Sequence, residues 1–448
     1  MPRRQDQIVR LLADVLLLGG DQKIAVLLSK FLMSKSSLWK HYCAMLVKGK
    51  VAAGDRLLSN LGGYLYGPND YVRFESHLSN LQNGIAIYGF FRAESGLGAS
   101  ARRSARSLQT TSVRISLHNL VDAHNFENIV DFDASDKLTS NLDTALIHLN
   151  ADSLLNLLPQ LPPHLLVRRR RIGYWHWELP VFPPKWAPAF KLVHEVWAPS
   201  RHVADLLSAA SDIPVKMVPH AAEATDIDAS DARTLLGLPA TAFVFLTIFD
   251  TNSYVARKNP LGVIRAFQDA FPLRTGSDHL LVVKYHGRNN RGPEFDELLR
   301  LAASDRRIVL IDKLYSEQQV RVLQAACDVY VSLHRAEGFG LNIIECMAEG
   351  KLAIATAFSG NTDFMSDENS LLVPFKMKRV LKGEYLHGEG QWWADPDHDA
   401  AVEALRMSVD QAVSARRREQ ARRDIAAGYS FEAVGKLSAA AWNDGGSS

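Results

Sequence analysis

Residues 328–350 read Asp328-Val-Tyr-Val-Ser-Leu333, then His334-Arg-Ala-Glu337-Gly-Phe-Gly-Leu341, then Asn-Ile-Ile-Glu345-Cys-Met-Ala-Glu-Gly350. The apolar and β-branched residues at the start of this segment predict a buried strand. After the Gly-Phe-Gly turn, the residues favour a helix that begins near Leu341 and ends at Gly350. A strand followed by a glycine-containing turn and a helix is the unit from which parallel α/β sheets are built. The segment therefore predicts an α/β fold.

The same alternation of strands and helical stretches extends along the chain in two series. Strand-like runs lie at 85–88, 113–117, 144–149, 171–175 and 193–198 in the first series, and at 243–248, 280–284, 308–311, 328–333 and 352–355 in the second. Because helical stretches separate the strands, each series predicts a doubly wound parallel sheet.

These two series predict a tandem of Rossmann-like domains with further helices at either end. Apolar residues at helical spacing predict an α-helical N-terminal extension over residues 1–80. We expect the first Rossmann-like domain over 81–222, the second over 223–428, and a C-terminal helix over 429–448 that crosses back to the first domain.

The composition excludes several classes of protein. The 448 residues include 51 Lys and Arg against 49 Asp and Glu, so a net charge of +2 gives no overall field for nucleic acid. No apolar run approaches the roughly 18 residues that span a bilayer, and no cleavable signal sequence is evident. The three cysteines, Cys43, Cys327 and Cys346, form no Cys-x-x-Cys pair. We therefore expect a cytoplasmic protein that binds no nucleic acid.

Two clusters of basic residues, at 168–171 and 416–423, are the exception to this balanced charge. A charge run of this kind is usually a solvated helix face. The alternative is a patch that binds anionic lipid, which would bring the protein to the cytoplasmic face of a membrane.

The turn between the strand and the helix at 328–350 has the properties of a donor site for a nucleotide-activated group. At the start of a helix, backbone amides point outwards at a positive helix end, which suits a pyrophosphate. Glu345 lies about one turn into the helix, where its carboxylate can accept hydrogen bonds from the adjacent hydroxyls of a ribose. Glu337 stays in the loop. The residues expected to form the pyrophosphate turn are Gly338, Phe339, Gly340 and Leu341.

Glu337 and Glu345 are separated by seven residues that include Gly-Phe-Gly. Two carboxylates near a helix are usually solvated surface, but open α/β sheets bind ligands at this edge. The pattern resembles the retaining glycosyltransferases of family 4, whose hallmark is Glu-x7-Glu within Glu-Gly-Phe-Gly-Leu. The similarity continues through the segments Lys351-Leu-Ala-Ile-Ala355, Ser359-Gly-Asn-Thr-Asp-Phe364 and Trp393-Ala-Asp-Pro-Asp397.

The resemblance implies a GT-B fold with an interdomain cleft, in which the second domain binds the nucleotide sugar and the first binds the acceptor. It also implies that Glu345 binds the ribose and that Glu337 contacts the donor hexose near the reacting carbon. Asn361 would belong to the donor-sugar loop. Such enzymes retain the anomeric configuration, with no divalent metal and no cofactor beyond the sugar nucleotide.

A second segment, Phe249-Asp-Thr-Asn-Ser-Tyr-Val-Ala-Arg257-Lys258-Asn-Pro260, follows the first strand of the second series. Departure of a nucleoside diphosphate leaves negative charge that a fixed cation stabilises. We expect Lys258, and in second place Arg257, to supply this cation. The segment resembles the diphosphate-clamping segment of the family, although many members carry another Arg where this chain has 250–253. Taken alone, an Arg-Lys pair before a proline is usually a solvated turn.

In the first series, Tyr88-Gly-Phe-Phe-Arg-Ala-Glu-Ser-Gly96-Leu-Gly98 joins a strand to a helix. A glycine-rich loop in this position also fits dinucleotide binding, but residue 101 is Ala, so Gly-x-Gly-x-x-Gly is incomplete. The resemblance implies that Gly96 and Gly98 approach the donor phosphates and the acceptor. The alternative is an ordinary tight turn.

The segment Gly173-Tyr-Trp-His176-Trp-Glu178-Leu-Pro180 places three aromatic residues, a His and a Glu at the end of a strand. Sugars stack on aromatic rings, so this segment is a candidate acceptor site in which His176 or Glu178 orients or deprotonates a hydroxyl. Aromatic residues alone usually mean core. His148 is a similar candidate, although a single His in an apolar strand is more often a satisfied core residue.

These observations predict a retaining glycosyltransferase. It would move a hexose, such as a mannose-like sugar, from a nucleotide-diphosphate sugar to a glycan or lipid-linked saccharide in surface polysaccharide (O-antigen or exopolysaccharide) synthesis. One alternative is an inactive nucleotide-sugar-binding subunit that positions a partner through the helical extension. Another is a nicotinamide-dependent oxidoreductase. The sequence does not predict the acceptor linkage or the oligomeric state.

Overall fold

The computed structural model describes residues 81–121, 130–157, 161, 165, 170–273, 278–287 and 292–445. Contacts divide these residues into two compact units. The N-unit comprises the described residues of 81–175, 183–197 and 208–216, and the C-unit comprises those of 176–182, 198–207 and 217–445. The helical extension predicted over 1–80 and Cys43 lie outside the described residues. The domain bounds proposed from the sequence remain predictions.

The N-unit is built on a six-stranded sheet in the order β2-β1-β3-β4-β5-β6. The strands are β1 (Gln82–Gly89), β2 (Ile115–Asn119), β3 (Leu142–His148), β4 (Arg170–Tyr174), β5 (Glu195–Ala198) and β6 (Val215–Met217). The pairs from β2 to β5 are parallel. Strand β1 is buried along most of its length, as expected for a parallel strand covered on both faces.

The helical elements of the N-unit follow the strands. They are α6 (Gly96–Gln109), α7 (Ala151–Leu157) and the 3₁₀ segment η3 (Pro184–Leu192). Helix α8 (Arg201–Ser208) follows β5 in the chain, and its first seven residues belong to the C-unit. Helix α6 begins where Ser95, its N-cap, accepts a hydrogen bond from the amide of Gly98. Its Ala101, Ala105 and Leu108 are buried.

The C-unit contains a second six-stranded sheet, in the order β12-β11-β10-β7-β8-β9. The strands are β7 (Phe243–Asp250), β8 (His279–His286), β9 (Ile308–Asp312), β10 (Val329–Ser332), β11 (Leu352–Thr356) and β12 (Leu371–Val373). All neighbouring pairs are parallel. Because the chain order reverses between the central strands β7 and β10, their carboxyl ends form the switch point at which open α/β sheets bind ligands.

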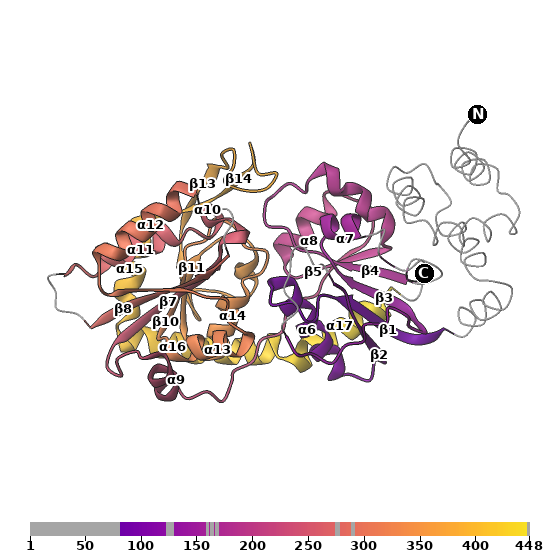
Figure 1. The fold of residues 1–448 in the computed structure, drawn as a ribbon, viewed down its shortest axis with the longest axis horizontal. Coiled ribbons are helices and arrows are strands. Elements are labelled where there is room, and N and C mark those ends of the chain that lie inside the picture. The colour runs from indigo at the N-terminus through magenta and orange to yellow at the C-terminus, as the bar shows by residue number, and fades with distance from the viewer. Residues whose placement is uncertain are drawn as a thin grey trace, which may run out of the picture. The chain divides into compact units, whose positions relative to one another are not determined.

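Side chains from this sheet enter two hydrophobic cores, one on each face. Along β7, Phe245 and Phe249 belong to one core, and Val244, Leu246 and Ile248 to the other, as the two-residue period of a strand requires. Helices α11 (Pro260–Ala270), α12 (Gly292–Ser304) and α15 (His398–Ser408) cover the first core, and α13 (Glu317–Ala326), α14 (Leu341–Ala348) and α16 (Gln411–Tyr429) cover the second (Figure 1). The C-unit is therefore doubly wound.

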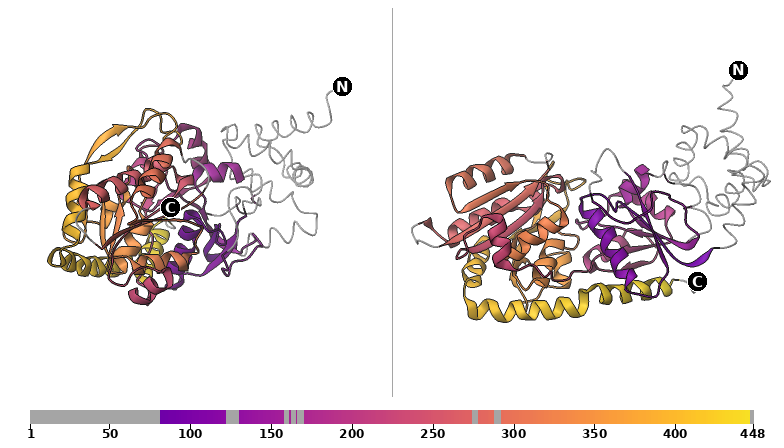
Figure 2. Two further views of the ribbon diagram at one scale, coloured as in Figure 1. Left: turned by 60° about the vertical axis from the view of Figure 1, so that its left-hand side comes forward. Right: turned by 60° about the horizontal axis from the view of Figure 1, so that its bottom comes forward.

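The remaining elements of the C-unit lie outside this sandwich. They are α9 (Ala229–Leu236), η4 (Thr251–Ser253), α10 (Val255–Lys258), η6 (Gly360–Asp363), the antiparallel hairpin of β13 (Phe375–Arg379) and β14 (Trp392–Pro396), and α17 (Phe431–Asn443). Helix α17 continues in the general direction of α16 after Ser430, which caps it (Figure 2). Among the described residues, no helix is both long and apolar enough to cross a membrane. The α/β class predicted from the sequence is confirmed.

Candidate active site

The loop between β10 and α14 holds Glu337 in place through its backbone. The amide of Glu337 donates to Oγ of Ser359 at 2.8 Å, and its carbonyl accepts from the amide of Gly360 at 3.0 Å. A Cβ on Gly360 would lie 2.3 Å from the carbonyl oxygen of Gly338, so only glycine permits the two loops to approach this closely. Glu337 is 8% exposed. Its carboxylate is therefore buried and aimed by rigid neighbours.

Two basic side chains that follow β7 face this carboxylate. Nζ of Lys258 hydrogen-bonds to Oε1 of Glu337, and Nη1 of Arg257 lies 3.5 Å from the same oxygen. Asn259, at a left-handed φ of 50°, donates from Nδ2 to the carbonyl of Leu333 at 2.8 Å. This hydrogen bond ties the end of α10 to the loop after β10. The switch point thus brings together cations and a carboxylate that lie far apart in sequence.

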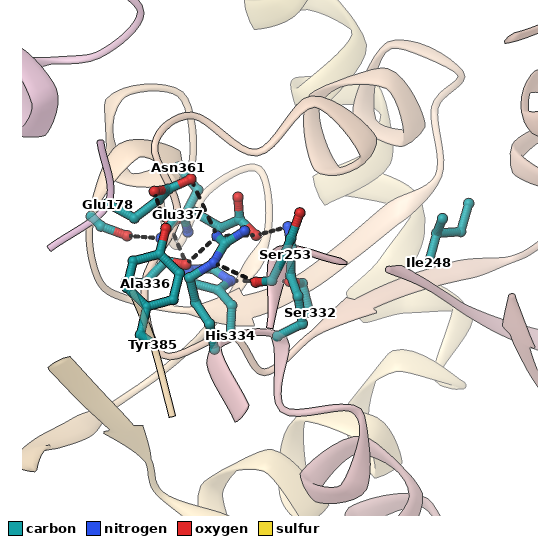
Figure 3. A network of polar contacts seen from close by, with 12 residues as sticks. Glu178, Ile248, Ser253, Ser332, His334, Ala336, Glu337, Asn361 and Tyr385 are labelled. Carbon is teal, nitrogen blue, oxygen red and sulfur yellow. Dashed lines mark hydrogen bonds and ion pairs between the residues drawn. The ribbon is translucent and has the colours of Figure 1, made fainter. Parts of the chain in front are cut away.

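Nε and Nη1 of Arg257 contact protein atoms. Its Nε donates to the carbonyl of Ser253 at 3.1 Å, and its Nη1 donates to the carbonyl of Ala336 at 2.9 Å. Nη1 also lies 3.8 Å from Oε1 of Glu178, and the guanidinium sits 5.6 Å from the centre of the Tyr385 ring. Figure 3 shows this network. Arg257 is 3% exposed, whereas the side chain of Lys258 is 20% exposed. Of the two, Lys258 is the more accessible cation.

The charges in this cluster set each other's protonation. Burial raises the pKa of Glu337, but Lys258 and Arg257 outweigh it and lower the pKa to about 2. Burial lowers the pKa of Lys258, and the carboxylate of Glu337 offsets part of that effect. For Arg257, the carboxylates of Glu178 and Glu337 overcome burial and raise the pKa. Glu337 is therefore ionised at neutral pH and acts as the counter-ion of two cations.

His334 and Asn361 support the loop between β10 and α14 through hydrogen bonds. Nε2 of His334 lies 3.1 Å from the carbonyl of Phe358 and 3.1 Å from Oδ1 of Asn361, while Nδ1 lies 3.0 Å from Oγ of Ser332. Both partners of Nε2 are acceptors, so Nε2 carries the proton and Nδ1 accepts from the hydroxyl. Burial lowers the pKa of His334, in keeping with a neutral ring.

Asn361 is fully buried, and its side chain is engaged within the protein. Its Nδ2 donates to the carbonyl of Thr356 at 2.9 Å and contacts Sδ of Met365 at 3.3 Å. The donor-binding role expected of Asn361 stays a prediction, and the geometry points to support of the loop.

The turn at 338–341 serves the site through its backbone. Gly340 has a left-handed φ of 101° and caps α14, and the carbonyl of Gly338 accepts from Oγ of Ser200 at 2.6 Å. The Phe339 side chain is 3% exposed and packs against Phe364. Leu341 begins α14 and packs partly buried against the same core. Phe339 thus anchors the turn, and the donor-binding role expected of it stays a prediction.

Glu345 lies in α14, as predicted, and is 5% exposed. Its Oε2 accepts from Nε2 of Gln324 at 2.6 Å and lies 3.9 Å from Nη1 of Arg321. Both partners belong to α13. The motif's second carboxylate is therefore joined to the neighbouring helix, one turn beyond the loop that holds Glu337.

The segment 176–182 belongs to the C-unit, and it brings Glu178 and His176 to the same region. The Tyr385 hydroxyl, from the hairpin loop, donates to Oε2 of Glu178. Burial raises the pKa of Tyr385, and the Glu178 carboxylate raises it further. His176 lies 2.9 Å through Nε2 from Nε2 of His220, with the two rings stacked. Glu178 therefore joins the Arg257 cluster, whereas His176 pairs with another histidine.

This histidine pair predicts a loss of stability in acid. Burial lowers the pKa of His176 to about 4, although Glu178 opposes the shift. Between pH 6.5 and about 4 the unfolded chain binds a proton that the folded protein does not, so stability falls as the pH falls. We expect about 1–3 kcal/mol from this group, measured as the difference in urea unfolding free energy between pH 7 and pH 4.5.

His176→Gln should remove most of that difference. His398→Gln, at a half-exposed histidine paired with Asp269, is the matched control and should leave the difference unchanged. Equal acid destabilisation of the wild type and His176→Gln would contradict this interpretation of the pair.

Gly96 and Gly98, in the first turn of α6, lie in different environments. A Cβ on Gly98 would lie 2.2 Å from the carbonyl oxygen of Ala93 and 2.8 Å from that of Phe90, whereas nothing lies within 4 Å of one on Gly96. Gly98 is thus required by packing, and Gly96 is not. Their proposed contact with phosphates or acceptor stays a prediction. His148 is buried and stacked on Tyr174, which matches the core interpretation.

Alanine substitutions at these two glycines should have different effects on the free energy of unfolding. Gly98→Ala is expected to lower the unfolding free energy by about 1–3 kcal/mol, because two backbone carbonyls must move. Gly96→Ala should change it by less than about 0.5 kcal/mol or stabilise α6 slightly. Urea unfolding measures both, and equal effects at the two positions would refute the steric argument.

Sequence reasoning missed three residues of this site. Tyr385 lies in a hairpin loop without any motif, and Gln324 lies on a helix whose apolar pattern explains its other residues. Ser359, which accepts from the Glu337 amide, was within a segment quoted for its similarity but was not singled out. Only the proximity of the loops in space identifies these residues.

Comparison with known protein families finds a similarity in this part of the chain. The profile of the family "Glycosyl transferases group 1" matches residues 254–381. The match covers less than a third of the chain, which is similar to group 1 glycosyltransferases over that segment. The matched segment contains Lys258, Glu337 and Glu345, whereas His176 and Glu178 lie outside it. No curated protein matches this sequence.

Solved structures with the same fold share little sequence with this chain. Sucrose-phosphate synthase from Thermosynechococcus elongatus has 16% identity and a TM-score of 0.58, over 81% of this chain and 99% of that one. HepE from Anabaena, in complex with UDP-glucose, has 15% identity and a TM-score of 0.58, over 81% and 100%. A glycosyltransferase from Rickettsia africae has 13% identity and a TM-score of 0.57, over 81% and 98%. These similarities confirm the predicted GT-B class.

Proposed function

We propose that this protein is a retaining hexosyltransferase that takes its sugar from a nucleoside diphosphate hexose. The observation that supports this most directly is the cluster of Glu337, Lys258 and Arg257 at the switch point of the C-unit sheet. Two cations balanced by one buried carboxylate, beside the start of α14, match the charge of a diphosphate leaving group next to a sugar.

Each residue takes a separate role in this proposal. Lys258 contacts the diphosphate and stabilises the charge that develops as the bond to the sugar breaks. Glu337 contacts the hexose near the reacting carbon and keeps Lys258 in place. Arg257, whose Nε and Nη1 contact protein atoms, positions Glu337. Glu345 accepts hydrogen bonds from the ribose, and the backbone of 338–341 faces the pyrophosphate.

The reaction that the family resemblance implies retains the anomeric configuration. The bond between the sugar and the diphosphate breaks, and the leaving phosphate oxygen takes the proton of the acceptor hydroxyl. That hydroxyl oxygen then bonds to the same face of the sugar. No side chain has to act as the base in this scheme. Glu178 and His176 are proposed to orient the acceptor, and Gly96 and Gly98 to line its loop.

The proposal extends to the chemical class of the sugar donor and of the acceptor. A protein of the same fold, HepE, is described in complex with UDP-glucose, so uridine diphosphate hexoses are the first donors to test, with a mannose-like hexose as the alternative. We propose a glycan or lipid-linked saccharide acceptor in surface polysaccharide synthesis. The protein would act in the cytoplasm, with the basic residues of 416–423 and 168–171 contacting the membrane face.

The test is a donor screen followed by one substitution. Wild-type protein is titrated with UDP-, GDP- and ADP-hexoses, and sugar release or transfer is followed by the nucleoside diphosphate formed. Glu345→Ala should weaken binding of the preferred donor by about 10- to 100-fold, since hydrogen bonds to a charged group are lost. Unchanged affinity would place the nucleotide elsewhere. Tight binding with no turnover on any acceptor would favour the inactive subunit, and failure to bind a nicotinamide nucleotide would exclude the oxidoreductase.

A further inference from the structure

The carboxylate of Glu345 is held by a side chain outside the Glu-x7-Glu motif. Gln324 is 0% exposed on α13, and its Nε2 donates to Oε2 of Glu345 at 2.6 Å and to Oδ1 of Asn342 at 3.2 Å. Both acceptors belong to α14. Gln324 therefore joins α13 to α14 at the carboxylate itself.

The orientation of the Gln324 amide is fixed from its other side. Arg321, one turn earlier on α13, donates from Nη1 to Oε1 of Gln324 at 2.9 Å. A guanidinium only donates and an ionised carboxylate only accepts, so the Gln324 amide cannot turn over without losing both partners. Arg321 is held in turn by Glu349, whose Oε1 accepts from Nη2 at 2.8 Å and from the amide of Thr225 at 2.9 Å.

We propose that Gln324 is a positioning residue that makes the nucleotide site selective for ribose. This inference rests on the proposed function, in which Glu345 accepts hydrogen bonds from ribose hydroxyls. A carboxylate offers about four acceptor positions around its two oxygens. With Nε2 of Gln324 on Oε2, the carboxylate cannot rotate without breaking a buried hydrogen bond. The directions in which Glu345 meets a hydroxyl are therefore set before the nucleotide binds.

The test measures selectivity instead of affinity alone. The probe is UDP, GDP or ADP, whichever the wild type binds most tightly, together with the 2′,3′-dideoxy form of the same nucleotide, both by isothermal titration calorimetry. The wild type should prefer the ribonucleotide by roughly 10- to 100-fold, as expected for hydrogen bonds to a charged group. In Gln324→Met this preference should fall at least about fivefold, because the carboxylate is no longer oriented, while affinity for the dideoxynucleotide stays within about twofold.

If Gln324 had only a structural role, Gln324→Met would weaken the binding of both nucleotides equally. The ratio of the two affinities would then stay unchanged. Gln318→Met, on an exposed glutamine of the same helix, is the matched control and should match the wild type. If Gln324→Met does not fold, Gln324→Leu, a smaller apolar replacement that also lacks the Nε2 donor, should lose selectivity in the same way.

The possible failures are distinguishable. An unchanged ratio in a folded Gln324 variant overturns this inference and leaves the proposed function intact. A wild type that binds the ribo and dideoxy forms equally overturns the ribose role of Glu345 and this inference with it. A wild type that binds no nucleoside diphosphate overturns the proposed function itself.

Discussion

Replacing Glu337 by glutamine is expected to lower kcat at least about 100-fold, the scale on which charge-stabilising groups act in enzymes. The substitution keeps the shape of the side chain but removes the charge that faces Lys258 and Arg257. It should also lower the unfolding free energy by about 3 kcal/mol, because two buried cations lose their common counter-ion. Release of nucleoside diphosphate measures kcat, and urea unfolding measures stability.

Asp305→Asn is the control that separates the loss of kcat from the loss of stability. Asp305 is 1% exposed and pairs with Arg307 at 2.7 Å, ahead of β9 and therefore at the amino edge of the sheet. The control should lose stability by a similar mechanism but keep its kcat. If Glu337→Gln retained more than a tenth of wild-type kcat, the proposed place of Glu337 beside the reacting sugar would be wrong.

Lys258→Met should lower kcat by about 100- to 1,000-fold, because charge on the departing diphosphate loses its fixed cation. It should also change the acid stability of the protein. In the wild type the pKa of Glu337 is lowered to about 2, so its stabilising contribution is present above pH 4.5 and is lost as the pH falls towards 2. Without Lys258 the pKa of Glu337 rises, so this contribution becomes smaller.

Enzyme assay and urea unfolding at pH 7 and pH 3 check both statements about Lys258. Lys436→Met, on an exposed lysine of α17, removes the same charge elsewhere and should leave both properties unchanged. Loss of stability between pH 7 and pH 3 that is equal in the wild type and Lys258→Met would show that Lys258 does not set the pKa of Glu337.

The sequence predicted the α/β class, the helix that begins at Leu341 and the position of Glu337 and Glu345 because these depend on local patterns. The strand, turn and helix of 328–350 are consecutive in the chain, so periodicity and glycine placement suffice to identify them. The same reasoning located Lys258, since it follows directly after a strand that the apolar pattern marks.

Partners brought together by the fold could not be found in this way. That Arg257 faces phosphates stays a prediction, but no local pattern indicated that its side chain also donates to two carbonyls and lies near the carboxylate of Glu178, 79 residues earlier. Phe339 was grouped with a ligand-binding turn, whereas its ring lies in the core. Tyr385 had no signal at all. In each case the deciding fact is which side chain another element places nearby, and no local pattern encodes that.

Three hydrogen bonds, each involving an arginine, join the segment after β7 to the loop after β10. Arg257 donates to the carbonyl of Ala336, Arg335 donates from its side chain to the carbonyl of Ala256, and the amide of Arg335 donates to the carbonyl of Arg257. Loops usually open readily, but these two cannot separate without breaking all three bonds together. Their amide hydrogens should exchange with solvent as slowly as those of the strands they follow. The two loops would then lose little conformational entropy when a ligand binds there.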